Sequence, residues 1–104
     1  MFEKHKKYVV RELHQIEGHK EINQWIFMFT NDYGVSVICH KINGQIISYG
    51  NTSNPYELAV LDNEYEPCYD TPITDDVIGY LTEEDIEKYL DEIMKLEDKA
   101  KWQI

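Results

Sequence analysis

Carboxylates recur at regular intervals in the second half of the chain. The stretch "DNEYEPCYD", residues 62–70, has an acidic side chain at four of its five even-numbered positions: Asp62, Glu64, Glu66 and Asp70. Alternate side chains of an extended strand lie ~6.6 Å apart on one side, so an extended stretch here would present a regular row of carboxylates. Such a row is suited to meeting a basic protein surface or a divalent cation.

A second acidic feature follows at helical spacing. Glu83, Glu87 and Asp91 are spaced four residues apart, and Asp98 lies close to the same line. Like charges at this spacing destabilise a helix by roughly 0.2–0.5 kcal/mol per pair. A local cost of this kind, without an evident structural return, is a reason to suspect a function.

The charge of the whole chain is concentrated in the same half. The net charge is −10, but residues 1–50 contribute 5 acids and 6 Lys or Arg, whereas residues 51–104 contribute 15 acids and 4 Lys. This balance argues against a general nucleic-acid binder, because such a surface repels phosphate. DNA carries one charge about every 3.4 Å of its axis per strand, so the two acidic features together could imitate a phosphate track. The alternative is that they only solvate the fold.

The elements that must position these acids begin with strands. Two runs rich in β-branched and aromatic residues, "KYVVRELHQI" and "INQWIFMFT", are joined by a Gly-containing polar link and predict a hairpin. The Asn43-Gly44 pair predicts a second hairpin between "VSVICHKI" and "QIISYG". "YELAVL" predicts a further strand, and Pro67 would confine any strand after it to a sheet edge.

The period changes near the end of the chain. Residues 74–76 could start a short helical turn that Gly79 ends, and Thr82 with Asp85 resembles a capping box. A helix over about residues 83–98 would have one apolar stripe, made of Ile86, Tyr89, Leu90, Ile93 and Leu96. We therefore expect a single α+β domain over residues 1–104, with an antiparallel sheet of five or six short strands and a C-terminal amphipathic helix packed on one face.

Aromatic residues offer a second kind of contact surface. Tyr65 and Tyr69 would lie on the opposite side of an extended stretch from the acids, and we expect them in the core. Trp102 lies past the securest part of the helix, and it could anchor a partner or a second copy of the chain.

Catalytic and metal-binding patterns are weak in this sequence. His14, His19, His40 and Cys39 invite a metal interpretation, yet their spacing fits no zinc motif, and neighbours on a strand point to opposite faces. The sequence also contains no Gly-rich phosphate loop or nucleophile elbow. We expect no enzyme activity, no cofactor and no metal site, and we expect Cys39 and Cys68 to be reduced structural residues.

The first residues, "MFEKHKKYVV", are charged and contain no apolar run of signal-peptide length. No segment of the sequence approaches the length needed to cross a bilayer. We expect a cytoplasmic protein.

Three phrases, "NDYGVSVI", "YELAVL" and "YDTPITDDVIGYLTEEDI", resemble small uncharacterised proteins encoded by bacteriophages and prophages. The resemblance covers about residues 31–86 and transfers no catalytic residue. It implies a phage product in a bacterial host cell, where small acidic proteins often resemble inhibitors of defence nucleases of the CRISPR or restriction type.

Two hypotheses follow. The first is a phage protein that binds a basic surface, with a nucleic-acid-binding host protein as the expected partner and with no direct contact to nucleic acid or membrane. Its partner-binding residues would be the following: Asp62, Glu64, Glu66, Asp70, Glu83, Glu87, Asp91, Asp98 and Trp102. The second is a structural or assembly module that forms a homo-oligomer such as a homodimer. The first predicts binding that weakens with salt, and the second predicts self-association that hardly depends on salt.

Overall fold

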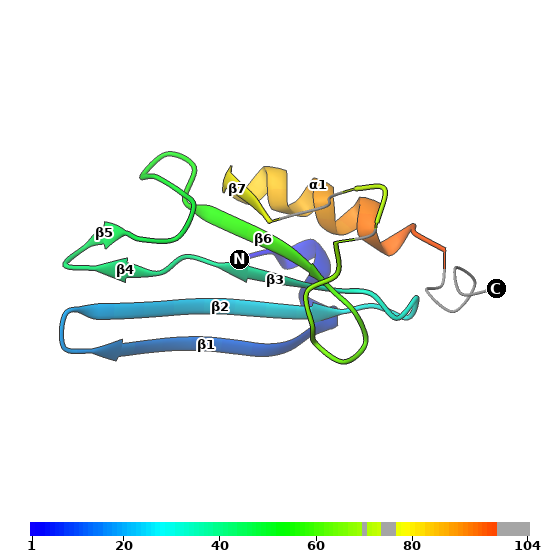
Figure 1. Ribbon diagram of the computed structural model, residues 1–104, viewed down its shortest axis with the longest axis horizontal. Helices are drawn as coiled ribbons and strands as arrows, with labels where there is room; N and C mark the ends of the chain where they lie inside the picture. The colour runs from blue at the N-terminus through cyan, green and yellow to red at the C-terminus, as the bar shows by residue number, and fades with distance from the viewer. Residues whose placement is uncertain (70, 74–76, 98–104) are drawn as a thin grey trace.

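The computed structural model describes residues 1–69, 71–73 and 77–97, which form one antiparallel sheet and one α-helix (Figure 1). The chain starts with a 3₁₀-helix, η1 (Glu3–Tyr8). The strands are β1 (Val9–Glu17), β2 (Lys20–Met28), β3 (Gly34–Ile38), β4 (Lys41–Ile42), β5 (Gln45–Ile46), β6 (Tyr56–Leu61) and β7 (Ile78–Leu81). The α-helix is α1 (Glu83–Met94). The predicted α+β class is confirmed, with seven strands in place of five or six.

Strand β2 organises the sheet. On one side it pairs with β1, and on the other side it pairs with β3 near its end and with β4 near its start. From β3 the sheet continues through β6 to β7, and from β4 it continues to β5. Strand β1 is therefore the outermost strand along one long edge (Figure 1).

Two tight turns fix the register of the hairpins. Between β1 and β2, Glu17 pairs with Lys20, and Gly18 has the positive φ of 62° that the first central position of a type II′ turn requires. Between β4 and β5, Asn43 and Gly44 both have positive φ, as in a type I′ turn. The second hairpin is the one that the Asn-Gly pair predicted.

Helix α1 begins as the sequence indicates and ends early. The Thr82 side chain accepts from the Asp85 N–H, and the Asp85 carboxylate accepts from the Thr82 N–H, which completes the predicted capping box. The helix ends at Met94, so the predicted extent of 83–98 was too long. Buried Asn31 donates through Nδ2 to the carbonyl oxygens of Ile93 and Leu96, and it thereby satisfies backbone acceptors that a helix end leaves open.

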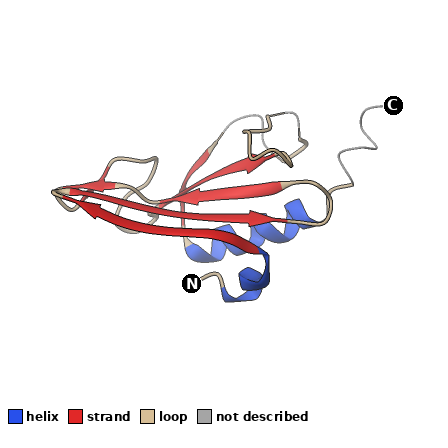
Figure 2. Cartoon of the chain, turned by 90° about the horizontal axis from the view of Figure 1, so that it is seen from below, coloured by secondary structure: helices blue, strands red, loops and turns tan. Residues whose placement is uncertain are grey.

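The core lies between α1 and one face of the sheet (Figure 2). Trp25 and Phe27 of β2 belong to the core, whereas Ile26 between them lies outside the core cluster because successive strand residues point to opposite faces. The buried set from the other elements includes Phe2, Val35, Val37, Leu58, Val60, Ile86, Leu90 and Ile93. Cys39 and Cys68 are buried in the same cluster.

Glycine 79 has a different role from the one expected. Residues 74–76 lie outside the described ranges, and Gly79 is part of β7 instead of ending a helical turn. Its backbone passes so close to Tyr49 that an added Cβ would lie 2.5 Å from the Tyr49 Cβ. The Tyr80 N–H donates to the Tyr49 carbonyl oxygen at 2.9 Å. The glycine therefore permits close approach of two backbones.

The sheet extends well beyond the helix. The molecule measures 48 × 23 × 21 Å, and its long axis follows the β1–β2 hairpin (Figure 1). We call the far part of this hairpin, residues 12–24, together with residues 39–46, which contain β4 and β5, the arm. Its residues are mostly exposed or half-buried, and Ile16 on β1 is 75% exposed.

Candidate functional site

The acidic stretch after β6 folds into a turn and not into an extended edge strand. The Asp62 carboxylate accepts from the N–H groups of Glu64 and Glu66, and the Asp62 N–H donates to the Glu66 carbonyl oxygen at 2.8 Å. Tyr65 within the turn has a φ of 65°. The expected row of carboxylates is therefore absent from residues 62–66, because Asp62 caps the backbone of its own turn. Glu64 and Glu66 are exposed at its tip.

The two tyrosines expected in the core are exposed. Tyr65 is 54% exposed and Tyr69 is 50% exposed. Tyr65 lines a shallow hollow with Val10, Arg11 and Ile26, so it lies over the sheet face that α1 does not cover. The core expectation was wrong because it assumed strand alternation in a segment that turns.

Two members of the helix ridge, our name for Glu83, Glu87 and Asp91, hold a buried histidine. His5 of η1 is 2% exposed, and its Nδ1 lies 2.6 Å from Glu87 Oε2 while its Nε2 lies 2.8 Å from Asp91 Oδ1. The Glu87 side chain is 14% exposed and the Asp91 side chain is 56% exposed. The like charges of Glu87 and Asp91 therefore stabilise the structure, because both carboxylates bind His5 and so hold η1 against α1.

The protons of this cluster follow from its geometry. An ionised carboxylate can only accept hydrogen bonds, and a neutral imidazole has one donor and one acceptor nitrogen. Each of the two short contacts therefore needs one proton between the imidazole nitrogen and the carboxylate oxygen. Glu87 Oε1 is buried with no hydrogen-bond partner among the described residues, so this carboxylate is held through Oε2 alone.

A groove of about 430 Å³ lies beside this cluster, between η1 and α1. Five acids and two lysines line it, namely Glu3, Lys4, Glu83, Glu84, Glu87, Lys88 and Asp91. Glu83 and Glu84 are exposed in the first turn of the helix. Among the described residues, neither has a lysine or arginine within ion-pair distance. We call Glu3, Glu83, Glu84, Glu87 and Asp91 the helix acidic face.

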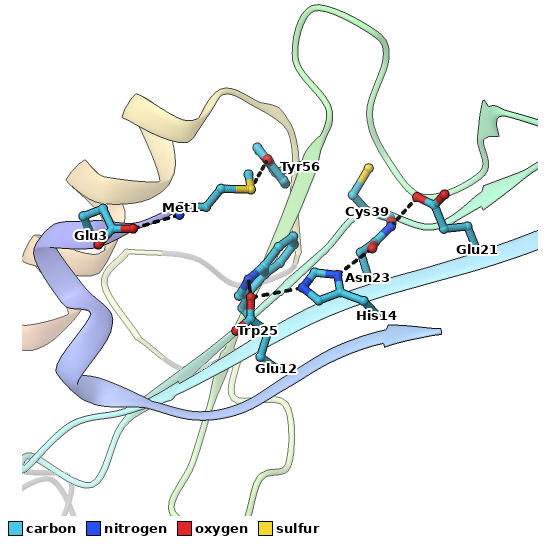
Figure 3. Close-up of polar contacts among 9 residues, drawn as sticks. All are labelled: Met1, Glu3, Glu12, His14, Glu21, Asn23, Trp25, Cys39 and Tyr56. Carbon is cyan, nitrogen blue, oxygen red and sulfur yellow. Dashed lines mark hydrogen bonds and ion pairs between the residues drawn. The ribbon is translucent and has the colours of Figure 1, made fainter. Parts of the chain in front are cut away.

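A second polar cluster lies on the arm, on the sheet face that α1 covers farther along (Figure 3). Glu12 of β1 accepts from Trp25 Nε1 at 2.8 Å and pairs with His14 Nε2 at 3.0 Å. His14 Nδ1 lies 2.7 Å from Asn23 Oδ1, and Asn23 Nδ2 donates to Glu21 and to the Cys39 carbonyl oxygen. Because both oxygens accept, both His14 nitrogens donate.

The hydrogen bonds of this cluster shift the pKa values of its members in opposite directions. The bond to Asn23, and then the bond to Glu12, raise the pKa of His14. The bonds from His14 and Trp25 lower the pKa of Glu12. The two groups therefore form an ion pair over a wider pH range than isolated side chains would.

The residues considered for a metal site are spread along the arm. His14 is on β1, His19 is in the β1–β2 turn, and Cys39 and His40 lie between β3 and β4. His40 Nδ1 accepts from the Asn23 N–H, and burial lowers the pKa of His40 and raises that of the Cys39 thiol. Within residues 1–69, 71–73 and 77–97, no three His, Cys, Asp or Glu residues are grouped so as to hold a metal ion.

The structure brings only part of the expected site together. Glu83, Glu87 and Asp91 share the helix acidic face, whereas Asp62, Glu64 and Glu66 lie in the turn after β6. Tyr65 places that turn over the sheet face opposite α1. Asp70, Asp98 and Trp102 lie outside the described residues. His5 was missed, and the signal that could have found it was the ridge of like charges, because a hydrogen-bond donor near its carboxylates offsets their repulsion.

In the described part of the chain, no helix is both long and apolar enough to cross a membrane. Comparison of the chain with family models, curated proteins and solved structures gives no match, so the helix acidic face has to be interpreted from its own geometry.

Proposed function

We propose that this protein is a non-enzymatic acidic binding protein whose helix acidic face meets a basic surface on a host or phage protein. The observation that carries the proposal is the groove between η1 and α1, which is lined by five carboxylates and only two lysines. A patch of one dominant sign speeds the encounter with a partner of the opposite sign and selects against partners of the same sign. A nucleic-acid-binding protein of the bacterial host, such as a restriction or CRISPR nuclease, is the first target class to test.

The helix supports this role better than the turn after β6 does. Asp62 is engaged by its own backbone, which leaves Glu64 and Glu66 as the exposed acids of the turn. A partner that touches α1 would not reach Tyr65 and its neighbours, because they lie over the other face of the sheet. DNA mimicry would therefore depend on the helix acidic face alone, where successive ridge residues are ~6 Å apart.

His5 and His14 support a binding role over catalysis. Both ring nitrogens of His5 are bonded to carboxylates, and both ring nitrogens of His14 are bonded to Asn23 and Glu12. A general acid or base must bring a nitrogen within hydrogen-bond reach of its substrate. In this conformation neither residue has a nitrogen to offer.

The test compares charge reversal on the two faces. Glu83→Lys with Glu84→Lys changes the helix acidic face while leaving Glu87 and Asp91 to hold His5. Glu64→Lys with Glu66→Lys is the matched control, because it makes the same change in net charge on the turn. The wild type and both variants are tagged and immobilised, and the amount of each purified restriction or CRISPR nuclease that they retain is measured. The washes contain increasing salt, and DNA is added as competitor.

We expect the helix variant to lose binding at least tenfold while the control stays within about twofold of the wild type. Binding should also fall as salt rises, because screening weakens attraction between exposed charges. Equal loss in both variants would show that only net charge matters. Loss in the turn variant alone would move the site to the opposite face and overturn the proposal.

A further inference from the structure

The outer edge of β1 presents a run of backbone groups that suits another strand. Within the described ranges, no strand or helix lies beyond β1 along this edge (Figure 1). Its sequence from Val9 to Glu17 contains no proline, the residue that commonly blunts such edges. We propose that β1 pairs with β1 of a second copy of this chain, antiparallel and centred on Leu13. This inference is independent of the proposed partner of the helix acidic face.

The hydrogen bonds of β2 show which backbone groups of β1 point outward. The Asn23 carbonyl oxygen accepts from the Cys39 N–H, and the Asn23 N–H donates to His40 Nδ1, so both groups point away from β1. His14 is directly opposite Asn23, which makes this a non-hydrogen-bonded pair of the β1–β2 ladder. The backbone groups of His14 therefore point away from β2, and those of Glu12 and Ile16 do the same by alternation.

Charge favours the register centred on Leu13, because this register alone sets Glu12 opposite His14. With Leu13 opposite Leu13 of the second copy, Glu12 faces His14 of the second copy and His14 faces its Glu12. Both residues are on the same sheet face, where they already form an ion pair within one chain at 3.0 Å. Two acids and two imidazolium groups would then alternate around the symmetry axis, and opposite charges directly across an antiparallel pair are stabilising.

The two adjacent registers, and the one centred on Arg11, place like charges on the axis. Centring on Glu12 sets two carboxylates opposite each other, centring on His14 sets two imidazoles opposite each other, and centring on Arg11 does the same for two guanidinium groups. Like charges directly opposite are destabilising. In the Leu13 register, Arg11 faces Gln15 and the two leucines face each other across the axis. That register leaves no like-charged pair between residues 11 and 15.

The bulge between Val9 and Arg11 limits the length of the ladder. Glu12 and His14 of both chains supply four backbone hydrogen bonds, and Ile16, which is 75% exposed, extends the contact past them. A contact this short buries less area than the roughly 1,200–2,000 Å² of a stable interface. We therefore expect a weak, reversible dimer.

The pairing also determines where the other surfaces lie in the dimer. Residues directly opposite in an antiparallel ladder point to the same face. Both α1 helices would then lie on one face of a continuous fourteen-stranded sheet, seven strands coming from each copy. The dimer would present two helix acidic faces in the same direction.

Cysteine trapping tests the register. In a non-hydrogen-bonded pair the Cα atoms are about 4.5 Å apart, which is within disulfide range. Leu13→Cys should therefore form an intermolecular disulfide under mild oxidation by glutathione. Gln15→Cys is the matched control, because residue 15 would face residue 11 and the two introduced thiols would lie ~13 Å apart. We expect at least tenfold more cross-linked dimer from Leu13→Cys, and equal cross-linking would overturn the register.

Charge exchange provides a second test that does not depend on cysteine. Glu12→Lys alone sets Lys opposite His14, and His14→Glu alone sets Glu opposite Glu12, so each variant should self-associate at least tenfold more weakly. A mixture of the two restores opposite charges at every position and should form a heterodimer in sedimentation equilibrium. Absence of dimer from the mixture, or wild-type protein that stays monomeric at 1 mM, would overturn the proposal. Circular dichroism confirms folding of each variant.

Discussion

The two ends of the sheet are stabilised by different means. At one end, α1 and η1 cover the sheet, and the side chains between them, such as Phe27, Leu58 and Leu90, are fully buried. At the other end, the arm has a polar network of Glu12, His14 and Asn23 on the same face. The covered half therefore contains most of the free energy of burial, while the arm is held by backbone pairing and exposed hydrogen bonds. The covered half can therefore keep the chain folded while the outer edge of β1 on the arm stays free to pair with another strand.

Both halves contain a histidine bonded to carboxylates, and the two histidines differ in how far they are buried. His5 is enclosed by Glu87 and Asp91 in the covered half, and His14 pairs with Glu12 on the arm. The His5 side chain is 3% exposed, whereas the His14 side chain is 50% exposed. Ion pairs that are exposed to water contribute little, whereas breaking a buried pair leaves a charge without a partner.

Removing a core side chain should have the largest effect. Leu90→Ala deletes a fully buried side chain from α1 and should lower the free energy of unfolding by about 2–5 kcal/mol. Ile16→Ala on the arm is the control, and it should change stability by less than about 0.5 kcal/mol because the side chain is 75% exposed. Urea unfolding followed by Trp fluorescence measures both. Equal losses would mean that the arm has a core of its own.

The buried histidine should give the next largest effect. His5→Ala leaves the Glu87 carboxylate, which is 14% exposed, without its donor, and it should cost about 1–3 kcal/mol. A double-mutant cycle of His5→Ala with Glu87→Ala should give a larger coupling energy than the cycle with Asp91→Ala, because Asp91 is 56% exposed. The matched cycle on the arm, His14→Ala with Glu12→Ala, should give only a few tenths, roughly 0.2–0.5 kcal/mol.

The order of these coupling energies is the critical result. If the His14 cycle equalled the Glu87 cycle, burial would not distinguish the two halves. If His5→Ala had no effect on stability, the contacts of the helix ridge with His5 would not stabilise the fold. The repulsion within the ridge would then be explained only by a function such as partner binding.

Local patterns predicted the parts of the fold that local chemistry controls. The Asn43-Gly44 turn and the Thr82–Asp85 capping box each depend on residues that are neighbours in sequence, and both are present. The turn at residues 62–66 was also encoded locally, because Asp and Asn favour side-chain to backbone bonds in turns. The alternating acids resembled a strand pattern more strongly, so the stretch was assigned the wrong conformation.

The main parts of the candidate site depend on contacts across the chain. His5 lies 82 residues from Glu87 and 86 residues from Asp91, so no window of sequence contains the cluster. The sequence also could not indicate that Tyr65 lies over the sheet face opposite α1, because that placement follows from the path of the chain after β6. The spacing of Glu83, Glu87 and Asp91 is visible in the sequence, but the contacts of Glu87 and Asp91 with His5 required the fold.

The two arm histidines offer the finest test, since one NMR titration should show their pKa values shifted in opposite directions. Hydrogen bonds to Asn23 and Glu12 raise the pKa of His14 above its ordinary value near 6.5, whereas burial lowers the pKa of His40. The stability that His14 contributes is therefore fully present below about pH 6.5 and is lost as pH rises through its folded pKa. The contribution of His40 has the opposite sign, since it is present above about pH 6.5 and is lost as pH falls. Asn23→Ala should return the His14 pKa toward 6.5. An unchanged value would show that the hydrogen bond to Asn23 does not raise the pKa of His14.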